Sequence, residues 1–268
     1  MKMTPLRAGL VAGGLLVAIM TLVFDFTSLD IAITGFFYDT TGSDHFPMEA
    51  MNPWSWLNQN GDKAFLYLGI ALALFLLIVG LIKRRFRPFI VYAVFILISY
   101  AIGAGLIVNV LLKGTKLGAF YVGWSRPRPR DIIMFGGTES FYPVWAPAFL
   151  DGLQLTNSSF PSGHTTAGSS FFAFFLAFSN VDFVEGIFGE KTPQRQVLYR
   201  VIKYTWLVLA IGLGVLLSIT RIISGAHFTS DCMYAFVFTW LPATVLYYWV
   251  FNIPRLERRA MEKTGLAT

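Results

Sequence analysis

Long apolar runs restrict what this sequence can fold into more than any other feature. Six of them are long enough, or nearly so, to cross a bilayer as helices: residues 8–24, 64–82, 89–112, 162–181, 204–219 and 233–251. A hydrocarbon core about 30 Å thick needs roughly 20 apolar residues of helix. Charged residues make up 13% of the chain, about half of the roughly 25% that is usual in soluble domains. We therefore predict an all-α, polytopic membrane protein folded as a six-transmembrane-helix bundle.

The same runs predict the domain organisation. They extend through the whole chain, so we expect one membrane domain over residues 1–268, with its core at 64–251. Two connecting segments, 25–63 and 113–161, are long for links between helices. Long ordered loops tend to carry function, so we expect the functional residues to lie near these two segments.

Lysine and arginine are shared unevenly between the two ends of the predicted bundle. If six helices alternate, 14 of the 21 basic residues fall at one end, and such an excess marks the cytoplasmic side. They are Lys2, Arg7, Lys83, Arg84, Arg85, Arg87, Lys191, Arg195, Arg200, Lys203, Arg255, Arg258, Arg259 and Lys263. We therefore expect both termini in the cytoplasm and the two long loops on the periplasmic face of the inner membrane. No small-residue cleavage site follows the first run, which favours an uncleaved anchor over a signal peptide.

Besides Lys63, six basic residues fall on the outer face, against this charge bias: Lys113, Lys116, Arg126, Arg128, Arg130 and Arg221. They belong to three short runs or lie close to them. The first run begins at Lys113 and continues in the Ser-Arg-Pro-Arg-Pro of residues 125–129. The second is the Pro-Ser-Gly-His of residues 161–164, and the third is Thr-Arg at 220–221 followed by His227 and Asp231. Ionisable groups near membrane are costly without a function, so we interpret the three runs as one site.

The residue types in these runs fit a phosphoryl dianion. Guanidinium groups donate paired hydrogen bonds to phosphate oxygens, and a lysine adds a compact positive charge. Pro161, Ser162 and Gly163 precede an apolar run, and they predict a helix start with free backbone N–H groups. Gly163 has no side chain to keep an oxyanion away from that backbone. These parts together predict a site for a dianion.

Two histidines supply the acid–base chemistry. Asp231 follows His227 by four residues, so on one helix the two side chains would share a face. A carboxylate bonded to one ring nitrogen fixes the tautomer and leaves the other lone pair free to attack phosphorus. His164, on another helix, is expected to protonate the departing oxygen and later to activate water. Beyond this, phosphoryl transfer needs mostly positioning and charge stabilisation.

These runs resemble the signature of the type 2 phosphatidic acid phosphatase family, also called lipid phosphate phosphatases. That signature is Lys-x6-Arg-Pro, then Pro-Ser-Gly-His, then Ser-Arg-x5-His-x3-Asp, and the resemblance covers about residues 91–248. It implies six membrane helices, with His227 as nucleophile, Asp231 as its partner and His164 serving the leaving group. It also implies that no metal is required and that phosphate is bound by Lys113, Arg128, Arg221, Ser162 and Gly163.

The chain departs from this signature in two places. Thr220 stands where the family has serine, which keeps a hydroxyl. Lys113 and Arg128 are separated by 14 residues instead of six, and Lys116 shortens the interval only to 11. An insertion after Lys113 that bulges out would bring this lysine back to the site. Lys116 remains open as the alternative phosphate ligand, and Arg126 as an additional one.

Composition argues against a metal, a cofactor and nucleic acid. Cys232 is the only cysteine, and His45, His164 and His227 include no closely spaced pair of the kind that binds zinc. The formal net charge of +6 comes mostly from residues that flank apolar runs, not from a basic stripe. We expect no metal, no cofactor and no nucleic-acid partner. The expected partners are the bilayer and a membrane lipid phosphate, and the sequence leaves the oligomeric state open.

The resemblance implies a metal-independent lipid phosphatase that acts through a phosphohistidine. Glycine and aromatic residues at 135–145 are similar to loops of bacterial enzymes that act on envelope lipids. Lipid A, phosphatidylglycerophosphate and undecaprenyl pyrophosphate are therefore the candidate substrates. A lipid-to-lipid phosphotransferase would use the same site, and a non-catalytic lipid-binding or transport protein could keep the fold. Vanadium haloperoxidases share this kind of phosphate pocket, but they are soluble, and six apolar runs argue against one.

Overall fold

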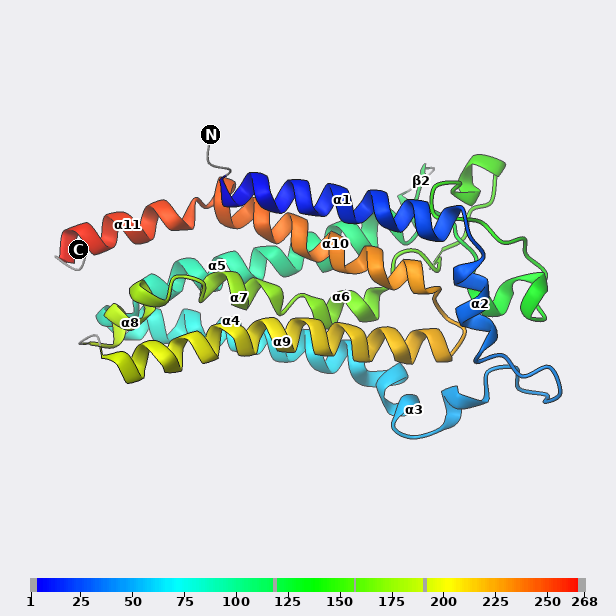
Figure 1. Ribbon diagram of the computed structural model, residues 1–268, viewed down its shortest axis with the longest axis horizontal. Helices are drawn as coiled ribbons and strands as arrows, with labels where there is room; N and C mark the ends of the chain where they lie inside the picture. Colours follow the sequence, from blue (N-terminus) through cyan, green and yellow to red (C-terminus); the bar gives the residue numbers. More distant parts are fainter. Residues whose placement is uncertain (1–3, 118–119, 157, 190–191, 265–268) are drawn as a thin grey trace.

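A bundle of helices that run side by side forms the body of the protein (Figure 1). The computed structural model describes residues 4–117, 120–156, 158–189 and 192–264. The helices are α1 (Pro5–Asp25), α2 (Leu29–Gly35), α3 (Trp54–Trp56), α4 (Asp62–Ile82), α5 (Pro88–Tyr100), α6 (Gly163–Ser169), α7 (Phe172–Ala177), α8 (Val181–Phe188), α9 (Pro193–Ile223), α10 (Thr229–Val245) and α11 (Ile253–Thr264).

Shorter segments complete the described chain. Segments of π-helix are η2 (Leu57–Gly61), η4 (Ala101–Leu112) and η8 (Leu246–Val250). Segments of 3₁₀-helix are η1 (Pro47–Ala50), η3 (Arg84–Phe86), η5 (Pro129–Asp131), η6 (Ile133–Phe135) and η7 (Ala148–Asp151). The strands β1 (Thr115–Leu117) and β2 (Phe120–Val122) pair antiparallel as one small hairpin.

Five helices are long and apolar enough to span a membrane, and a bent pair makes a sixth span if it is counted as one. The five are Pro5–Asp25, Trp54–Ile82, Pro88–Leu112, Pro193–Ile223 and Thr229–Val250. The bent pair is Gly163–Ala177 followed by Val181–Phe188, at an angle of 72°. Each predicted apolar run overlaps one of these spans, so the prediction of an all-α, multi-pass membrane protein is confirmed.

Three predicted span boundaries are wrong, because helices continue into polar sequence or stop at a cap. The second span begins at Trp54 rather than at residue 64, since α3 and η2 lead into α4 without a break. The fifth begins at Pro193 rather than at residue 204, after Thr192 caps a helix whose first turns are polar. The fourth ends at Ala177 rather than at residue 181, because Asn180 caps the separate helix α8.

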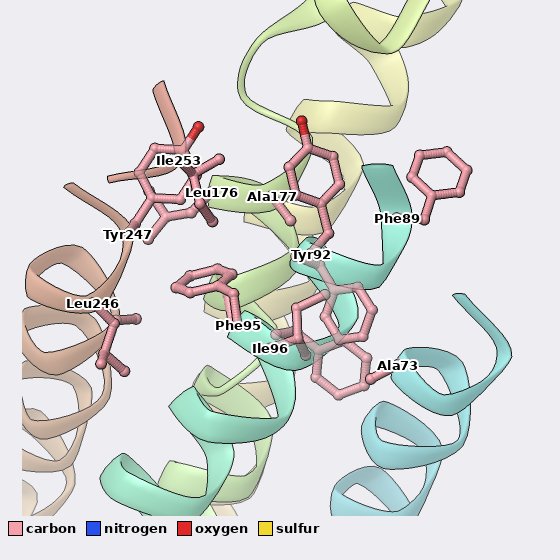
Figure 2. Close-up of a cluster of buried hydrophobic side chains, with 14 of the residues drawn as sticks. Ala73, Phe89, Tyr92, Phe95, Ile96, Leu176, Ala177, Leu246, Tyr247 and Ile253 are labelled. Atoms are coloured by element: carbon pink, nitrogen blue, oxygen red, sulfur yellow. The ribbon is translucent and has the colours of Figure 1, made fainter. Parts of the chain in front are cut away.

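An aromatic core joins the helices in the half of the bundle that contains α11 (Figure 2). The rings of Phe89 and Tyr92 in α5 lie 6.2 Å apart, and those of Phe95 and Tyr247 lie 5.6 Å apart. Lipid tails are as apolar as these rings, so close packing rather than exclusion from water holds the helices together here. The opposite half of the bundle carries the polar side chains of the candidate site.

Glycines bring α6 and α9 into close contact. A Cβ atom at Gly168 of α6 would lie 2.6 Å from the backbone nitrogen of Gly214 in α9. A Cβ atom at Gly214 would in turn lie 2.5 Å from the ring of Phe236 in α10. Small residues allow membrane helices to approach in this way. The crossing sets the first turn of α6 beside the last turn of α9, and both turns carry predicted site residues.

The two ends of the bundle differ. The described termini lie toward one end, whereas α2, α3 and the β1–β2 hairpin lie at the other (Figure 1). The connection that contains Arg84 and Arg85, and the helix that contains Arg255, lie toward the end with the termini. This is the arrangement that six alternating spans require. Lys2 and Lys191, two of the residues behind the orientation prediction, lie outside the described residues.

Candidate active site

A polar cavity of about 380 Å³ opens at the loop end of the bundle, where η4, α6 and α9 have their ends. It is lined by Asp62, Lys63, Leu66, Ala104, Asn109, Lys113, Arg128, Gly163, His164, Ala167 and Arg221. Four basic side chains therefore face one carboxylate, not counting His164. Such an excess of positive charge in a concave, partly buried site attracts anions.

Lys113 reaches the cavity from the end of η4. Its backbone N–H donates to the Val108 carbonyl at 3.0 Å, which completes the π-helical segment. The residues after it form the β1–β2 hairpin, and the Trp124 N–H then donates to the Leu112 carbonyl at 2.9 Å. The predicted insertion is thus a hairpin that returns the chain to its starting point; residues 118 and 119 lie outside the description. Lys116 is exposed on β1 and does not line the cavity, so of the two lysines only Lys113 lies there.

The first turn of α6 forms another wall of the cavity. Ser162 caps the helix and accepts a hydrogen bond from the Thr165 N–H at 3.3 Å, as the predicted helix start requires. The amides of Gly163 and His164 have no acceptor within the helix, because first-turn amides never do. A Cβ atom at Gly163 would lie 3.3 Å from Lys113 Nζ, so glycine lets the lysine approach this turn. Ser162 itself is fully buried and shapes the turn rather than lining the cavity.

His164 and Arg221 are both bonded to Asn58, a residue that the sequence analysis missed. His164 Nε2 lies 2.9 Å from the Asn58 carbonyl oxygen and 3.7 Å from Asp62 Oδ1. Arg221 Nη1 donates to Asn58 Oδ1, and Asn58 Nδ2 donates to Glu49 Oε1 at 2.6 Å. The segment 47–61 therefore closes one side of the site. Its only signal in the sequence is the polar Asn-Gln-Asn at 58–60, directly before an apolar run.

The cavity brings three cations together: Lys113, Arg128 and Arg221. Burial, followed by the charges of Arg221 and Arg128, lowers the pKa of Lys113 to about 8. Burial is also the main cause that lowers the pKa of Arg128, although a guanidinium keeps its charge at neutral pH. Three cations held this close to one another repel, and an anion between them would relieve that repulsion.

His227 lies beside this cation cluster but does not line the cavity. Its side chain is fully buried, and neither ring nitrogen has a hydrogen-bond partner among the described residues. Burial, and then the charges of Lys113, Arg221 and Arg128, hold the pKa of His227 well below its ordinary value. The imidazole is therefore neutral at physiological pH, with a lone pair available for attack.

The local geometry predicted for His227 and Asp231 is wrong in one respect. His227 precedes α10 instead of lying on it, because Phe228 is the N-cap and Asp231 is the third residue of the helix. The two side chains are neighbours all the same, with His227 Nδ1 3.8 Å from Asp231 Oδ2. That distance is too long for a hydrogen bond. The Asp231 carboxylate instead accepts from the Phe228 N–H at 2.8 Å and from the Ser159 hydroxyl.

Arg126 occupies a different position from the one predicted. It does not line the cavity, and its guanidinium is fully buried between two carboxylates. Nη1 lies 2.6 Å from Asp231 Oδ1, and Nη2 lies 3.0 Å from Asp30 Oδ2. Its donors are used within the protein, so Arg126 holds Asp231 in place and is not a phosphate ligand. The sequence could not distinguish it from Arg128, because each arginine stands before a proline.

The chemistry of the lining side chains is that of an anion site. Lysine, arginine and free backbone amides donate hydrogen bonds and positive charge, and none of these groups is a metal ligand. In the described part of the chain, no three His, Cys, Asp or Glu side chains are grouped so as to hold a metal ion. Three of the predicted cations, Lys113, Arg128 and Arg221, thus line a space suited to an anion together with His164, and His227 lies buried beside them.

Comparison with known proteins gives one family and one curated relative. The model of the PAP2 superfamily matches residues 93–255, which include Lys113, Arg128, Arg221 and both site histidines. The chain is similar to the lipid A 4'-phosphatase of Francisella tularensis subsp. novicida (strain U112), at 26% identity over 242 residues. That alignment covers 87% of this chain and 92% of the relative. No solved structure matches significantly. Asn58 and Asp30 lie before the region that the family model matches.

Proposed function

This chain belongs to the PAP2 superfamily, and we propose that it is a metal-independent phosphatase that removes a phosphate from lipid A. The active site is the cavity lined by Lys113, Arg128, His164 and Arg221, on the periplasmic face of the inner membrane. The name of the curated relative, lipid A 4'-phosphatase, favours lipid A over phosphatidylglycerophosphate and undecaprenyl pyrophosphate.

One observation carries the lipid part of this proposal: the polar cavity adjoins an apolar one. A cavity of about 280 Å³ shares Leu66, Ala104 and Asn109 with the cationic cavity. It continues between α4 on one side and α5 and η4 on the other, lined further by Ile70, Leu97, Tyr100, Ala101 and Gly105. A phosphate among the cations would thus have an apolar space beside it, as a phosphorylated lipid requires and a soluble phosphate ester does not.

The proposed reaction has two steps, and the first forms a phosphohistidine. His227 Nε2 attacks phosphorus, because Nδ1 is the ring nitrogen that faces Asp231. The N–P bond forms as the P–O bond to the lipid breaks. His164, which the phosphate dianion beside it keeps protonated, gives its proton to the departing oxygen. Lys113, Arg128, Arg221 and the amides of the α6 first turn stabilise the charge on the phosphoryl oxygens.

Water completes the proposed cycle. His164, now deprotonated, takes a proton from a water molecule whose oxygen attacks phosphorus. The N–P bond breaks, inorganic phosphate leaves, and His227 returns to its neutral form. Asp231 stabilises the positive charge that the ring of His227 carries while it is phosphorylated, through the 3.8 Å approach of the two groups.

The direct test is phosphate release by the purified protein in detergent. Lipid A, phosphatidylglycerophosphate, phosphatidate and undecaprenyl pyrophosphate are each supplied alone. We expect free phosphate from lipid A at the highest rate and little effect of EDTA. His227→Ala should reduce release at least about 1,000-fold, because the nucleophile is lost. His45→Ala is the matched control, since the ring of His45 lies on a loop, where Nδ1 is bonded to the Asp39 carbonyl, and it does not line the cavity.

Three results would contradict the proposal. Full activity of the His227→Ala variant would remove the nucleophile assignment. Release that depends on a second added lipid would identify a lipid-to-lipid phosphotransferase instead. No release from any of the four lipids by the folded wild-type protein would rule out the phosphatase.

A further inference from the structure

A buried ion cluster lies directly behind the proposed nucleophile. Arg126 is fully buried and is shared between two buried carboxylates, Asp30 and Asp231. Asp30 accepts hydrogen bonds from the Ser230 N–H at 2.9 Å, from the Ser230 hydroxyl and from Arg126 Nη2 at 3.0 Å. Burial raises the pKa of Asp30, and the charge of Arg126 and the two Ser230 donors act against that shift and favour the ionised form. Phe228 covers the other side, with its ring centre 4.4 Å from the guanidinium carbon.

The charges in this cluster do not cancel. Two carboxylates and one guanidinium leave one net negative charge in a buried place, where unbalanced charge is costly. The charge lies next to His227, whose Nδ1 is 3.8 Å from Asp231 Oδ2. Had Arg126 faced Asp231 alone, the pair would be neutral and its effect on the ring of His227 would be small. Asp30 therefore supplies the charge that leaves Asp231 electrostatically active.

Asp30 reaches this position through the N-terminal part of the chain. It lies on α2, which packs against α10, the helix that carries Asp231. Asp30 and Arg126 are 96 positions apart in the sequence. They meet because α2 lies across the loop end of the bundle (Figure 1). None of the three sequence runs of the site includes Asp30, and it lies before the region that the family model matches.

We propose that Asp30 is a positioning residue for the reaction: by sharing Arg126, it keeps a net negative charge on Asp231 and so stabilises the cationic, phosphorylated form of His227. This inference depends on the proposed function, because it assigns Asp30 a role in forming the phosphohistidine. Asp30 and Arg126 do not line the cavity, so the effect belongs to the chemical step and not to substrate binding.

The test begins with Asp30→Asn, which keeps the shape and removes the charge. We expect kcat for phosphate release to fall about tenfold to 100-fold, a loss typical of removing one electrostatic contribution to the transition state. KM should change less than about twofold, because binding contacts are intact. Asp39→Asn is the control: Asp39 lies on a loop at the same end of the bundle and accepts from the Thr41 N–H at 2.8 Å and from the Thr41 hydroxyl at 2.7 Å. Its kcat should remain near that of the wild type.

A double variant separates charge from packing. Adding Arg126→Gln to Asp30→Asn removes the cation and restores one net negative charge on Asp231. We expect the kcat of the double variant to rise at least about threefold above that of Asp30→Asn, because the charge near His227 returns. A purely structural role predicts the opposite, since loss of a second buried partner should lower activity further.

Each outcome decides the question. Wild-type kcat in folded Asp30→Asn, or a double variant less active than Asp30→Asn, would overturn the proposal. Size-exclusion chromatography and melting in detergent establish folding. If Asp30→Asn does not fold, the kcat of the double variant is compared with that of the wild type. A kcat of at least about one tenth of the wild-type value supports the proposal. A greater loss, or a double variant that does not fold, overturns it. Wild-type protein that releases no phosphate would instead mean that the proposed function is wrong.

Discussion

Lys113 shows how strongly a single residue in this site depends on its neighbours. An exposed lysine keeps its charge up to about pH 10, but burial and the nearby charges of Arg221 and Arg128 lower the pKa of Lys113 to about 8. A lysine with a lowered pKa loses its proton, and with it its charge, as pH rises through that value. A bound phosphate dianion has the opposite effect and favours the charged form.

The pH dependence of catalysis should reveal this shift. We expect kcat/KM to fall as pH rises through about 8, because the free enzyme loses the charge of Lys113 that attracts the substrate. The corresponding fall in kcat should come at higher pH, since bound phosphate keeps the lysine charged. Lys113→Arg should remove this limb of the kcat/KM profile, because a guanidinium does not titrate in that range. A limb near pH 8 that persists in Lys113→Arg would assign it to another group.

The two lysines that the sequence left as alternatives form a natural matched pair. Lys113 lines the cavity, and Lys116 is exposed on β1. We expect Lys113→Met to lower kcat/KM about 100-fold, through loss of one charge at the phosphoryl group. Lys116→Met should leave kcat/KM within about twofold of the wild type, as exposed charges contribute little. Equal effects of the two changes in a phosphate-release assay would refute this placement.

At the scale of elements, two helix ends shape the site. The π-helical η4 ends at Leu112, directly before Lys113, and carries the cavity residue Asn109. Segments of π-helix occur often at functional sites, because they re-aim side chains along a helix. Gly163 at the start of α6 completes the arrangement, since its missing side chain leaves room for Asn109 and Lys113.

Gly163→Ala tests whether this close approach matters. The new Cβ atom would lie 3.3 Å from both Asn109 Oδ1 and Lys113 Nζ, so both must move slightly. We expect kcat/KM to fall about tenfold, because small displacements of catalytic groups are expensive. Gly212→Ala in α9 is the control, since nothing lies within 4 Å of its added methyl group. Unchanged kinetics in a folded Gly163→Ala variant would show that the phosphate does not depend on this contact.

At the scale of the whole molecule, the arrangement of spans determines which side of the membrane the site faces. The cavity lies where α6 begins and α9 ends, and these helix ends are opposite the described termini (Figure 1). Basic residues such as Arg84 and Arg255 lie toward the end with the termini, and from the positive-inside rule we propose that this end is cytoplasmic.

Reporter fusions should distinguish the two ends in cells. A reporter after Thr268 is expected to read as cytoplasmic, and one inserted after Gly152 as external. Gly152 is exposed in the loop at the site end, so an insertion there is tolerated best. If both reporters read on the same side, the six-span arrangement is wrong, and if they are exchanged, the site faces the cytoplasm.

The sequence alone determined the fold class and predicted five of the eleven residues that line the cavity: Lys113, Arg128, Gly163, His164 and Arg221. The length of an apolar run reflects bilayer thickness, a local property, so each predicted run overlaps a span of the structure. Because successive spans cross the membrane in opposite directions, Lys113, His164 and Arg221 could be predicted to lie at the same end of the bundle before the packing of the helices was known. Span boundaries were less predictable, because helices such as α9 continue past the bilayer into polar sequence.

Only the tertiary structure decided which polar groups meet. Asn58 bonds Arg221, 163 residues later in the chain, and Asp30 shares Arg126 with Asp231. The pattern of residues along the sequence does not predict such contacts. They depend on which helices pack together and how closely, as where Gly168 of α6 meets Gly214 of α9. The choice between Lys113 and Lys116, and between Arg126 and Arg128, rested on the same packing. The sequence shows directly where charged residues and long apolar runs lie, whereas the packing of the helices decides which group a buried charge contacts.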